Sequence, residues 1–303
     1  MTRIVSLLPG ATEIVCALGL EADLVGRSHE CDFPTFIEQL PVVSKPRLNP
    51  SASGLEIDKS VKALVSQGLG VFEINAEQLR ALNPDVIITQ IQCEVCAVSE
   101  DDVRAAVGDW LSDAPQILSV RANSLEEVWQ DIERLGRSLG RADAARQVTG
   151  RLRTRMDQLA KATKQDPPSK TVLGIEWVQP LMASGNWIPE LIIAAGGQAV
   201  LAEAGQHSPW IEWNEIVQAD PDIIIVSPCG FSLERAAAEA SHLFELPGWS
   251  DLKAVREARV YAFEGHHYLH RPGPRLVDSA EFLARIISGD THTPNNRAFR
   301  ALA

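Results

Sequence analysis

Short apolar runs alternate with helical patterns along most of the chain, which predicts a layered α/β protein. Seven apolar, often β-branched runs are typical of strands buried in a parallel sheet: residues 4–8, 24–27, 85–89, 116–120, 171–176, 223–227 and 259–263. Helical spacing lies between them, at 12–18, 76–82, 101–111, 189–195 and 275–287, with Thr12 expected as the first N-cap. Because strand and helix alternate, we expect mostly parallel sheets.

A longer helical pattern separates the two halves. Apolar residues recur at helical spacing from 142 to 164 (Ala145, Val148, Leu152, Met156 and Leu159), and the sequence Asp166-Pro167-Pro168 ends the pattern. About 22 residues at 1.5 Å each make a rod of roughly 33 Å. The sequence therefore predicts an N-terminal α/β lobe (1–141), a joining helix (142–165) and a C-terminal α/β lobe (166–303).

The two halves also resemble each other. ALNPDVIITQ at 81–90 matches QADPDIIIVS at 218–227, and TEIVCALGL at 12–20 matches PELIIAAGG at 189–197. The two matches have different offsets, which excludes a tandem repeat of constant period. Two lobes of similar topology explain the likeness, and the alternative is that any parallel strand after a turn produces a Pro-Asp-apolar pattern.

Composition and charge narrow the classes of protein. The 303 residues are 45% hydrophobic and 22% charged, with a net charge of −12, which argues against a nucleic-acid partner. No window approaches the roughly 20 apolar residues of a membrane span. The opening MTRIVSLLPGATE is too short in its apolar run for a signal peptide, so the chain as written is expected in the cytoplasm, or in the periplasm or outside the cell if a leader precedes it. A monomer is expected.

Most of the unusual side chains follow predicted strands. In open parallel sheets, ligands bind beyond the carboxyl ends of the strands. The loops there contain Cys31, Cys93, Cys96, His29, His266, His267, His270, Trp177 and Tyr268, and further loops contain Trp187, His207 and Trp210. Two facing lobes would enclose a cleft lined by rings, imidazoles and thiols, which suits a large, flat, partly apolar ligand.

These motifs carry a family resemblance. IVSLLPGATEIVCALGL, LVGRSHECDFP, the LNPDVII segment and the joining helix resemble the substrate-binding proteins of vitamin B12 and siderophore ABC importers, and the cobalamin-binding members most closely, over roughly residues 3–287. The resemblance implies two Rossmann-like lobes joined by a rigid helix, which is the class III periplasmic-binding-protein fold. It also implies a ligand between the lobes, stacking residues at Asp32-Phe33-Pro34, Trp210 and Tyr268, and permease-docking glutamates at Glu77 and Glu215.

The cysteines leave three interpretations open. Cys31, Cys93 and Cys96 with His29, or with a histidine of the other lobe, would suit Zn²⁺ or Fe, or the metal centre of a bound chelate. A redox pair at Cys93 and Cys96 is disfavoured by Glu94 between them, because a carboxylate raises a thiol pKa. The third interpretation makes them small apolar wall residues of a ligand cleft. The Cys-x-x-Cys and the histidine-rich loop are not part of the cobalamin-binder pattern.

The loop GHHYLHRPGPR offers the same choice between structure and function. One histidine would supply an axial ligand to cobalt or iron, or the imidazoles would be satisfied within a surface loop. Arg271 and Arg275 would bind a ligand phosphate or carboxylate, and Arg275 is equally placed for a local ion pair with Asp278. Of the neighbours Trp210 and Trp213, one is expected in the core.

The sequence thus predicts a binding protein for a corrinoid, most simply cobalamin, that performs no chemistry. The expected ligand contacts are Pro9, His29, Asp32, Phe33, Trp177, Trp187, Trp210, His267 and Tyr268. The alternative is a cytosolic metal- or tetrapyrrole-handling protein, either an enzyme or a carrier, that uses the Cys/His site. A dehydrogenase is disfavoured because no G-x-G-x-x-G follows a predicted strand.

Overall fold

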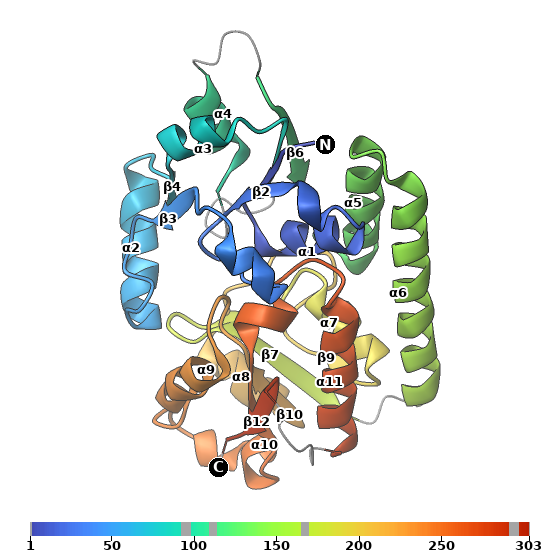
Figure 1. Ribbon diagram of the computed structural model, residues 1–303. Coiled ribbons are helices and arrows are strands. Elements are labelled where there is room, and N and C mark those ends of the chain that lie inside the picture. Colours follow the sequence, from blue (N-terminus) through green and yellow to red (C-terminus); the bar gives the residue numbers. More distant parts are fainter. Residues whose placement is uncertain (1, 92–97, 109–113, 165–169, 291–296, 303) are drawn as a thin grey trace. The chain divides into compact units, whose positions relative to one another are not determined.

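The computed structural model describes residues 2–91, 98–108, 114–164, 170–290 and 297–302 (Figure 1). The chain divides into two compact units, each described here by itself. The N-terminal unit comprises Met1–Ala52, Glu56–Ala122 and Glu126–Gly150, and the C-terminal unit comprises Ser53–Leu55, Asn123–Leu125 and Arg151–Ala303. The predicted three-part division, with boundaries at residues 142 and 165, stays a prediction. The boundary between the two units lies between Gly150 and Arg151, inside the predicted joining helix.

The N-terminal unit is built on a parallel sheet of four strands in the order β2-β1-β5-β6. The strands are β1 (Ile4–Ser6), β2 (Leu24–Arg27), β5 (Val86–Gln90) and β6 (Gln116–Val120). A small antiparallel pair joins β3 (Ser44–Pro46) to β4 (Phe72–Ile74). The helices are α1 (Pro9–Ala17), α2 (Gly54–Ser66), α3 (Ala76–Leu82), α4 (Glu100–Val107) and α5 (Leu125–Ser138), with 3₁₀ turns η1 (Glu21–Asp23) and η2 (Thr35–Gln39). Central strands β1 and β5 are buried along their whole length, as expected for strands covered on both faces.

The C-terminal unit has a mixed sheet in the order β12-β11-β10-β7-β8, with β9 paired to β7. Strands β7 (Thr171–Trp177), β10 (Ile223–Val226) and β11 (Val260–Phe263) are parallel, whereas β8 (Met182–Ala183) and β12 (Phe299–Ala301) run antiparallel to their neighbours. Strand β9 is Gln198–Ala199, and the helices are α7 (Ile188–Ala194), α8 (Trp213–Ala219), α9 (Leu233–Ala240), α10 (Lys253–Arg256) and α11 (Leu276–Ser288). Two 3₁₀ turns, η3 (Ser241–Leu243) and η4 (Trp249–Asp251), and the π-helical turn η5 (Gly265–Leu269) complete it.

The two-unit α/β architecture with mostly parallel central strands confirms the predicted fold class. The first helix, however, begins three residues before the predicted N-cap. Pro9 occupies the first helical position, where its missing N–H is no loss, and Leu8 is the cap. Thr12 lies within α1, and its Oγ1 donates to the Ser6 hydroxyl at 2.8 Å and contacts the Leu8 carbonyl oxygen at 3.2 Å.

Helix α5 was not among the predicted helices, although its pattern is strongly amphipathic. Val128, Trp129, Ile132 and Leu135 are all buried, at helical spacing, against the N-terminal unit. The short strands β8, β9 and β12 were also missed, because two or three residues carry too little periodicity to identify a strand.

The predicted joining helix is confirmed as α6 (Ala142–Thr163), which begins in the N-terminal unit and ends in the C-terminal one. In the first unit, Thr149 donates to the Glu133 carboxylate of α5 at 3.0 Å, and a Cβ on Gly136 would lie 2.3 Å from the Cβ of Ala145. Only glycine therefore lets α5 and α6 approach this closely. No described helix is long and apolar enough to cross a membrane.

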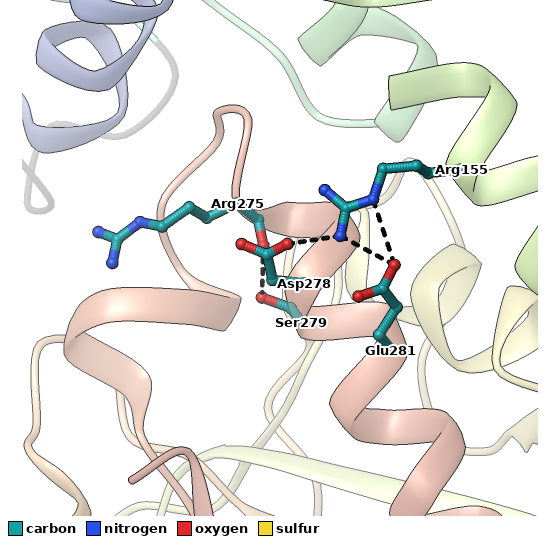
Figure 2. Close-up of polar contacts among 5 residues, drawn as sticks. All are labelled: Arg155, Arg275, Asp278, Ser279 and Glu281. Carbon is teal, nitrogen blue, oxygen red and sulfur yellow. Dashed lines mark hydrogen bonds and ion pairs between the residues drawn. The ribbon is translucent and has the colours of Figure 1, made fainter. Parts of the chain in front are cut away.

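In the second unit, an arginine fork attaches α6 to α11 (Figure 2). The Arg155 guanidinium contacts Asp278 Oδ1 at 2.7 Å and Glu281 Oε1 at 2.8 Å. Burial alone would lower the pKa of Arg155, but these two hydrogen-bonded carboxylates raise it above its usual value. All three side chains remain partly exposed, so the fork contributes about 1 kcal/mol rather than the several of a buried pair.

The paired sequence segments LNPD and ADPD have the same structure in both units. Helices α3 and α8 each end at a left-handed residue, Asn83 (φ 42°) and Asp220 (φ 37°), and Pro-Asp then leads into a buried strand. In both units the aspartate of this turn accepts a backbone N–H at the start of the neighbouring strand. The Arg3 N–H donates to Asp85 Oδ2 and the Thr171 N–H donates to Asp222 Oδ2, each at 2.7 Å. The internal likeness is therefore structural, beyond a shared turn composition.

Candidate ligand-binding site

The loop after β2 surrounds a buried thiol in the N-terminal unit. Cys31 is fully buried, and its Sγ lies 3.0 Å from Thr12 Oγ1 and 3.2 Å from Ser28 Oγ. A thiol enclosed by hydroxyls serves the packing of the loop, and a metal ion would have to displace them. The proposed Cys31 ligand is therefore disfavoured, whereas Cys93 and Cys96 lie outside the described residues. Among the described residues, Cys31 and His29 belong to no group of three metal-type ligands.

His29 presents a neutral imidazole beside this thiol. Its Nδ1 lies 2.8 Å from Ser44 Oγ, and its ring packs on Phe72 with centroids 5.3 Å apart. Burial, together with the charge of Arg27, lowers the pKa of His29 to about 4. At neutral pH the ring is uncharged, which suits hydrogen bonding or ring stacking. Among the other predicted contacts of this unit, Phe33 is exposed, and Pro9 and Asp32 are half-buried.

The tryptophans of the C-terminal unit separate into supporting and accessible side chains. Trp187 is only 4% exposed, and its Nε1 donates to the Leu269 carbonyl at 2.8 Å, so it supports the loop after β11 from beneath. Its role as a ligand contact stays a prediction, and in this structure its indole packs inside the unit. Trp210 is 55% exposed, whereas Trp213 packs against the core and donates to Pro247 O, so Trp213 is the expected core member of that pair. Trp177 is half-buried, edge-on to Phe231.

The histidine-rich loop after β11 is a single π-helical turn, Gly265–Leu269. The Glu264 carboxylate accepts the His267 backbone N–H at 2.6 Å and begins the turn. At its other end, His270 Nε2 donates to the Ser227 carbonyl at 2.6 Å. Single π-turns occur often at functional sites, and here both ends are fixed to strand ends of one sheet.

The arginines of this loop depart from the prediction. Arg271 is buried and donates to His266 Nε2 at 2.9 Å, so it shapes the turn from inside. Asp278 pairs with Arg155 rather than with Arg275, whose side chain extends away from Asp278 (Figure 2). The guanidinium of Arg275 instead lies over the Tyr268 ring, 5.6 Å from its centroid. The expected local ion pair is therefore wrong, because α6 supplies the cation that Asp278 needs.

Two acids at strand ends escaped the sequence reasoning. Glu176 at the end of β7 accepts the Ser208 hydroxyl at 2.7 Å and lies 3.8 Å from His270 Nδ1. Glu264 follows β11 directly, and its Oε1 lies 3.1 Å from His267 Nδ1. The available signal was an acid at the end of an apolar strand and next to a histidine-rich loop, at the sheet edge where ligands bind.

Each unit therefore presents partly exposed polar and aromatic side chains at the carboxyl ends of its parallel strands. His29, Asp32 and Phe33 belong to the first unit, and Trp177, His267 and Tyr268 to the second. Burial raises the pKa of Tyr268, which keeps its phenol protonated at neutral pH. Such sites bind ligands by stacking and hydrogen bonding.

Comparisons with known proteins agree with this description. Residues 4–265 match the family model described as periplasmic binding protein. The chain is 24% identical over 298 residues to an uncharacterized ABC transporter substrate-binding lipoprotein of Bacillus subtilis, covering 95% of this chain and 81% of the relative. It is 24% identical over 282 residues to a vitamin B12-binding protein of Vibrio cholerae, covering 92% of this chain and 86% of the relative.

A solved periplasmic heme-binding protein of Pseudomonas aeruginosa superposes with a TM-score of 0.73 at 20% identity, covering 100% of this chain and 98% of that one. At that identity the likeness shows the fold. The family model covers most of the chain and describes solute-binding proteins, which confirms the expectation of a binding protein rather than an enzyme. The chain belongs to the periplasmic binding protein family.

Proposed function

We propose that this protein binds a corrinoid, most simply cobalamin, and delivers it to the permease of an ABC importer. The observation that carries the proposal is the 24% identity, over 92% of the chain, to a protein named for vitamin B12 binding. The similar Bacillus subtilis protein is named as a substrate-binding lipoprotein of an ABC transporter. On the same grounds, we infer that the protein acts outside the cytoplasmic membrane.

The side chains at the strand ends suit a large planar ligand. Trp210 exposes more than half of its surface, and Trp177 and Tyr268 expose part of their rings. Aromatic faces stack on planar macrocycles, and a few polar groups fix the orientation of the ligand. His29, Asp32, Phe33 and His267 would supply such contacts, with Pro9 at the start of α1.

Haem is the second candidate, because a closely superposing structure is that of a heme-binding protein. A histidine is a common axial ligand of haem iron, and the turn after β11 contains two partly exposed histidines. A zinc or iron ion bound by Cys31 is not proposed, since that thiol is enclosed.

Glu77 and Glu215 remain the proposed docking residues for the permease. Both are exposed, near the N-termini of α3 and α8. A carboxylate there would pair with an arginine of the partner.

Titration of the purified protein with cyanocobalamin and, separately, with hemin tests the proposal. We expect saturation by one cyanocobalamin and weakening of about fivefold or more in Trp210→Ala, since removing a stacking Trp typically costs about 1 kcal/mol or more. Phe244→Ala, a partly exposed aromatic residue elsewhere in the same unit, serves as the control and should bind normally. Saturation by hemin alone would replace the corrinoid by haem, and binding of neither would overturn the proposal.

A further inference from the structure

The carboxylate of Glu176 lies where three loops of the C-terminal unit meet the end of β7. Glu176 is the second-last residue of that strand, and 15% of its side chain is exposed. Its Oε2 accepts the Ser208 hydroxyl at 2.7 Å and lies 3.8 Å from His270 Nδ1. Its backbone carbonyl accepts the Cys229 N–H at 3.3 Å. One residue therefore contacts the loop after β9, the loop after β10 and the end of the turn after β11.

The hydroxyl of Ser208 has a defined donor and acceptor role. Ser208 is 3% exposed, and its Oγ accepts the Gly185 N–H at 3.0 Å. The single hydroxyl proton is donated to Glu176. A Cβ on Gly185 would lie 2.6 Å from the Ser208 backbone nitrogen, so glycine is required for this close approach. Removing the carboxylate would leave a buried hydroxyl without its acceptor, which destabilises this conformation of the loop.

The same loop carries the exposed indole of Trp210, two residues beyond Ser208. The Pro209 carbonyl between them accepts the Ala183 N–H of β8 at 3.0 Å. The bond from Ser208 to a carboxylate is charge-assisted, and such bonds are stronger than neutral ones. It therefore adds a strong contact to the backbone hydrogen bonds that hold this part of the loop.

On its other side, Glu176 faces the imidazole at the end of the turn after β11. The His270 side chain is 6% exposed, and its Nε2 donates to the Ser227 carbonyl at 2.6 Å. The two ring nitrogens thus face polar groups at the ends of β7 and β10. Tyr268 lies two residues before His270 in the chain, and its ring is partly exposed. The contacts of His270 therefore hold the segment that carries Tyr268.

Asp222 shows what a carboxylate of equal exposure does at the opposite end of the same strands. Its side chain is also 15% exposed, and it accepts both the backbone N–H and the hydroxyl of Thr171. Thr171 is the first residue of β7, and Asp222 immediately precedes β10. Ligands of open parallel sheets bind at the carboxyl ends of the strands, which is where Glu176 lies.

We propose that Glu176 is a positioning residue for the aromatic side chains that bind the ligand. Through Ser208 the carboxylate orients Trp210. Through His270 it holds the turn that contains Tyr268. The inference rests on the proposed function and adds that one carboxylate sets the geometry of both rings. Binding side chains need such supporting hydrogen bonds to stay in their productive geometry.

The first measurement is the affinity of the full chain for cyanocobalamin, with hemin as the second probe. We expect Glu176→Ala to weaken binding about fivefold or more, as for Trp210→Ala. Adding Glu176→Ala to Trp210→Ala should cost less than it costs in the wild type, because the carboxylate acts through that ring. Glu176→Gln should restore most of the affinity, since its amide oxygen still accepts the Ser208 hydroxyl.

Asp222→Ala is the matched control for general destabilisation. It removes a carboxylate of equal exposure from the same sheet, at the end away from the three loops. We expect it to lower the stability of the protein and to leave the affinity for cyanocobalamin unchanged. An equal loss of affinity in Asp222→Ala and Glu176→Ala would overturn the positioning role.

A readout without ligand keeps the test independent of the proposed function. In the full chain labelled with 5-fluorotryptophan, the fluorine resonance missing from Trp210→Phe belongs to Trp210. We expect Glu176→Ala to shift that resonance. The resonance of Trp129, a buried ring of the N-terminal unit assigned in the same way, should stay in place. If Glu176→Ala does not fold, Ser208→Ala replaces it and should shift the Trp210 resonance likewise.

The outcomes separate this inference from the proposed function. If cyanocobalamin binds equally well to the wild type and to Glu176→Ala, or the Trp210 resonance does not move, the positioning role is overturned and corrinoid binding stands. Fully multiplicative losses in the double variant would overturn the route through Trp210. If neither cyanocobalamin nor hemin binds but the Trp210 resonance shifts in Glu176→Ala, the proposed function fails and the link between the two residues stands.

Discussion

The helix–turn–strand segments α3–β5 and α8–β10 share one backbone design but differ in their charges. Both helices have seven residues, end at a left-handed Asn83 or Asp220, and lead through Pro-Asp into a buried strand. In the first unit, Arg3 donates its side-chain N–H groups to the Leu82 and Asn83 carbonyls at the end of α3. In the second, Asp220 accepts the backbone N–H of Lys253, and the Lys253 ammonium pairs with Asp222.

The difference shows that a shared turn does not imply shared energetics. Asp85 is exposed and accepts a single backbone N–H, whereas the Asp222 side chain is 15% exposed and accepts from Thr171 twice and from Lys253. Asp222 therefore makes more polar interactions than Asp85, and it makes them where less water is present. Hydrogen bonds and ion pairs are stronger in such a low-dielectric environment.

The N-termini of the two helices differ as well. Glu77 is the second residue of α3, and the equivalent position in α8 is Asn214. Glu215 is the third residue of α8, where its Oε2 accepts the Glu212 backbone N–H at 2.7 Å in a capping box. The two proposed docking glutamates thus occupy non-equivalent positions, and Glu215 also accepts a backbone hydrogen bond at the cap of its own helix.

The largest expected effect comes from removing the aspartate of each turn. We expect Asp222→Ala to lower the free energy of unfolding by about 2–3 kcal/mol, because the amide of Thr171 and the Lys253 ammonium both lose their acceptor, and Asp85→Ala to lower it by about 1 kcal/mol. Urea unfolding followed by tryptophan fluorescence measures this, since five of the seven tryptophans belong to the C-terminal unit. Circular dichroism provides the matched probe for Asp85→Ala. Equal losses would contradict the comparison.

A smaller effect distinguishes capping from docking at the two glutamates. Glu215→Ala should cost about 1 kcal/mol of stability through loss of the capping box, whereas Glu77→Ala should be near neutral. If both glutamates dock, each substitution should also reduce stimulation of the permease ATPase. Glu215→Gln preserves the hydrogen bond to the cap but removes the charge, so it should impair stimulation alone. Full stimulation by Glu215→Gln and Glu77→Ala would contradict the docking role.

The smallest expected effect is the response to acid. Burial alone would raise the pKa of Asp222, but hydrogen bonds from Lys253 and Thr171 outweigh it and hold the pKa below 3.8, its ordinary value. A carboxyl with a depressed folded-state pKa contributes stability that is complete above its unfolded pKa and is lost as the pH falls through the folded one. We expect the wild type to lose this contribution below about pH 4 and Asp222→Asn to show a flatter dependence. If the free energy of unfolding changes with the same slope between pH 2 and pH 5 in the wild type and in Asp222→Asn, the depressed pKa of Asp222 is disproved.

The sequence by itself determined the central parallel strands of each sheet, the joining helix and the paired turns. Apolar runs such as those of β5 and β10 must be buried, Pro-Asp after a helix must turn, and a 22-residue amphipathic pattern ending at two prolines must be one helix. These properties depend on local sterics and on the transfer of apolar surface from water, so they can be read from neighbouring residues.

The tertiary structure alone decided which chemically similar side chain does what. Trp187 and Trp210 are both loop tryptophans in the sequence, but one is buried under Leu269 and the other is exposed. Likewise, the three histidines of the turn after β11 differ in their ring partners: His267 lies beside the Glu264 carboxylate, His266 beside the Arg271 guanidinium and His270 beside the Ser227 carbonyl. Trp187 and Leu269 are 82 residues apart and His270 and Ser227 are 43 apart, so these contacts depend on proximity in space, which residue spacing does not encode.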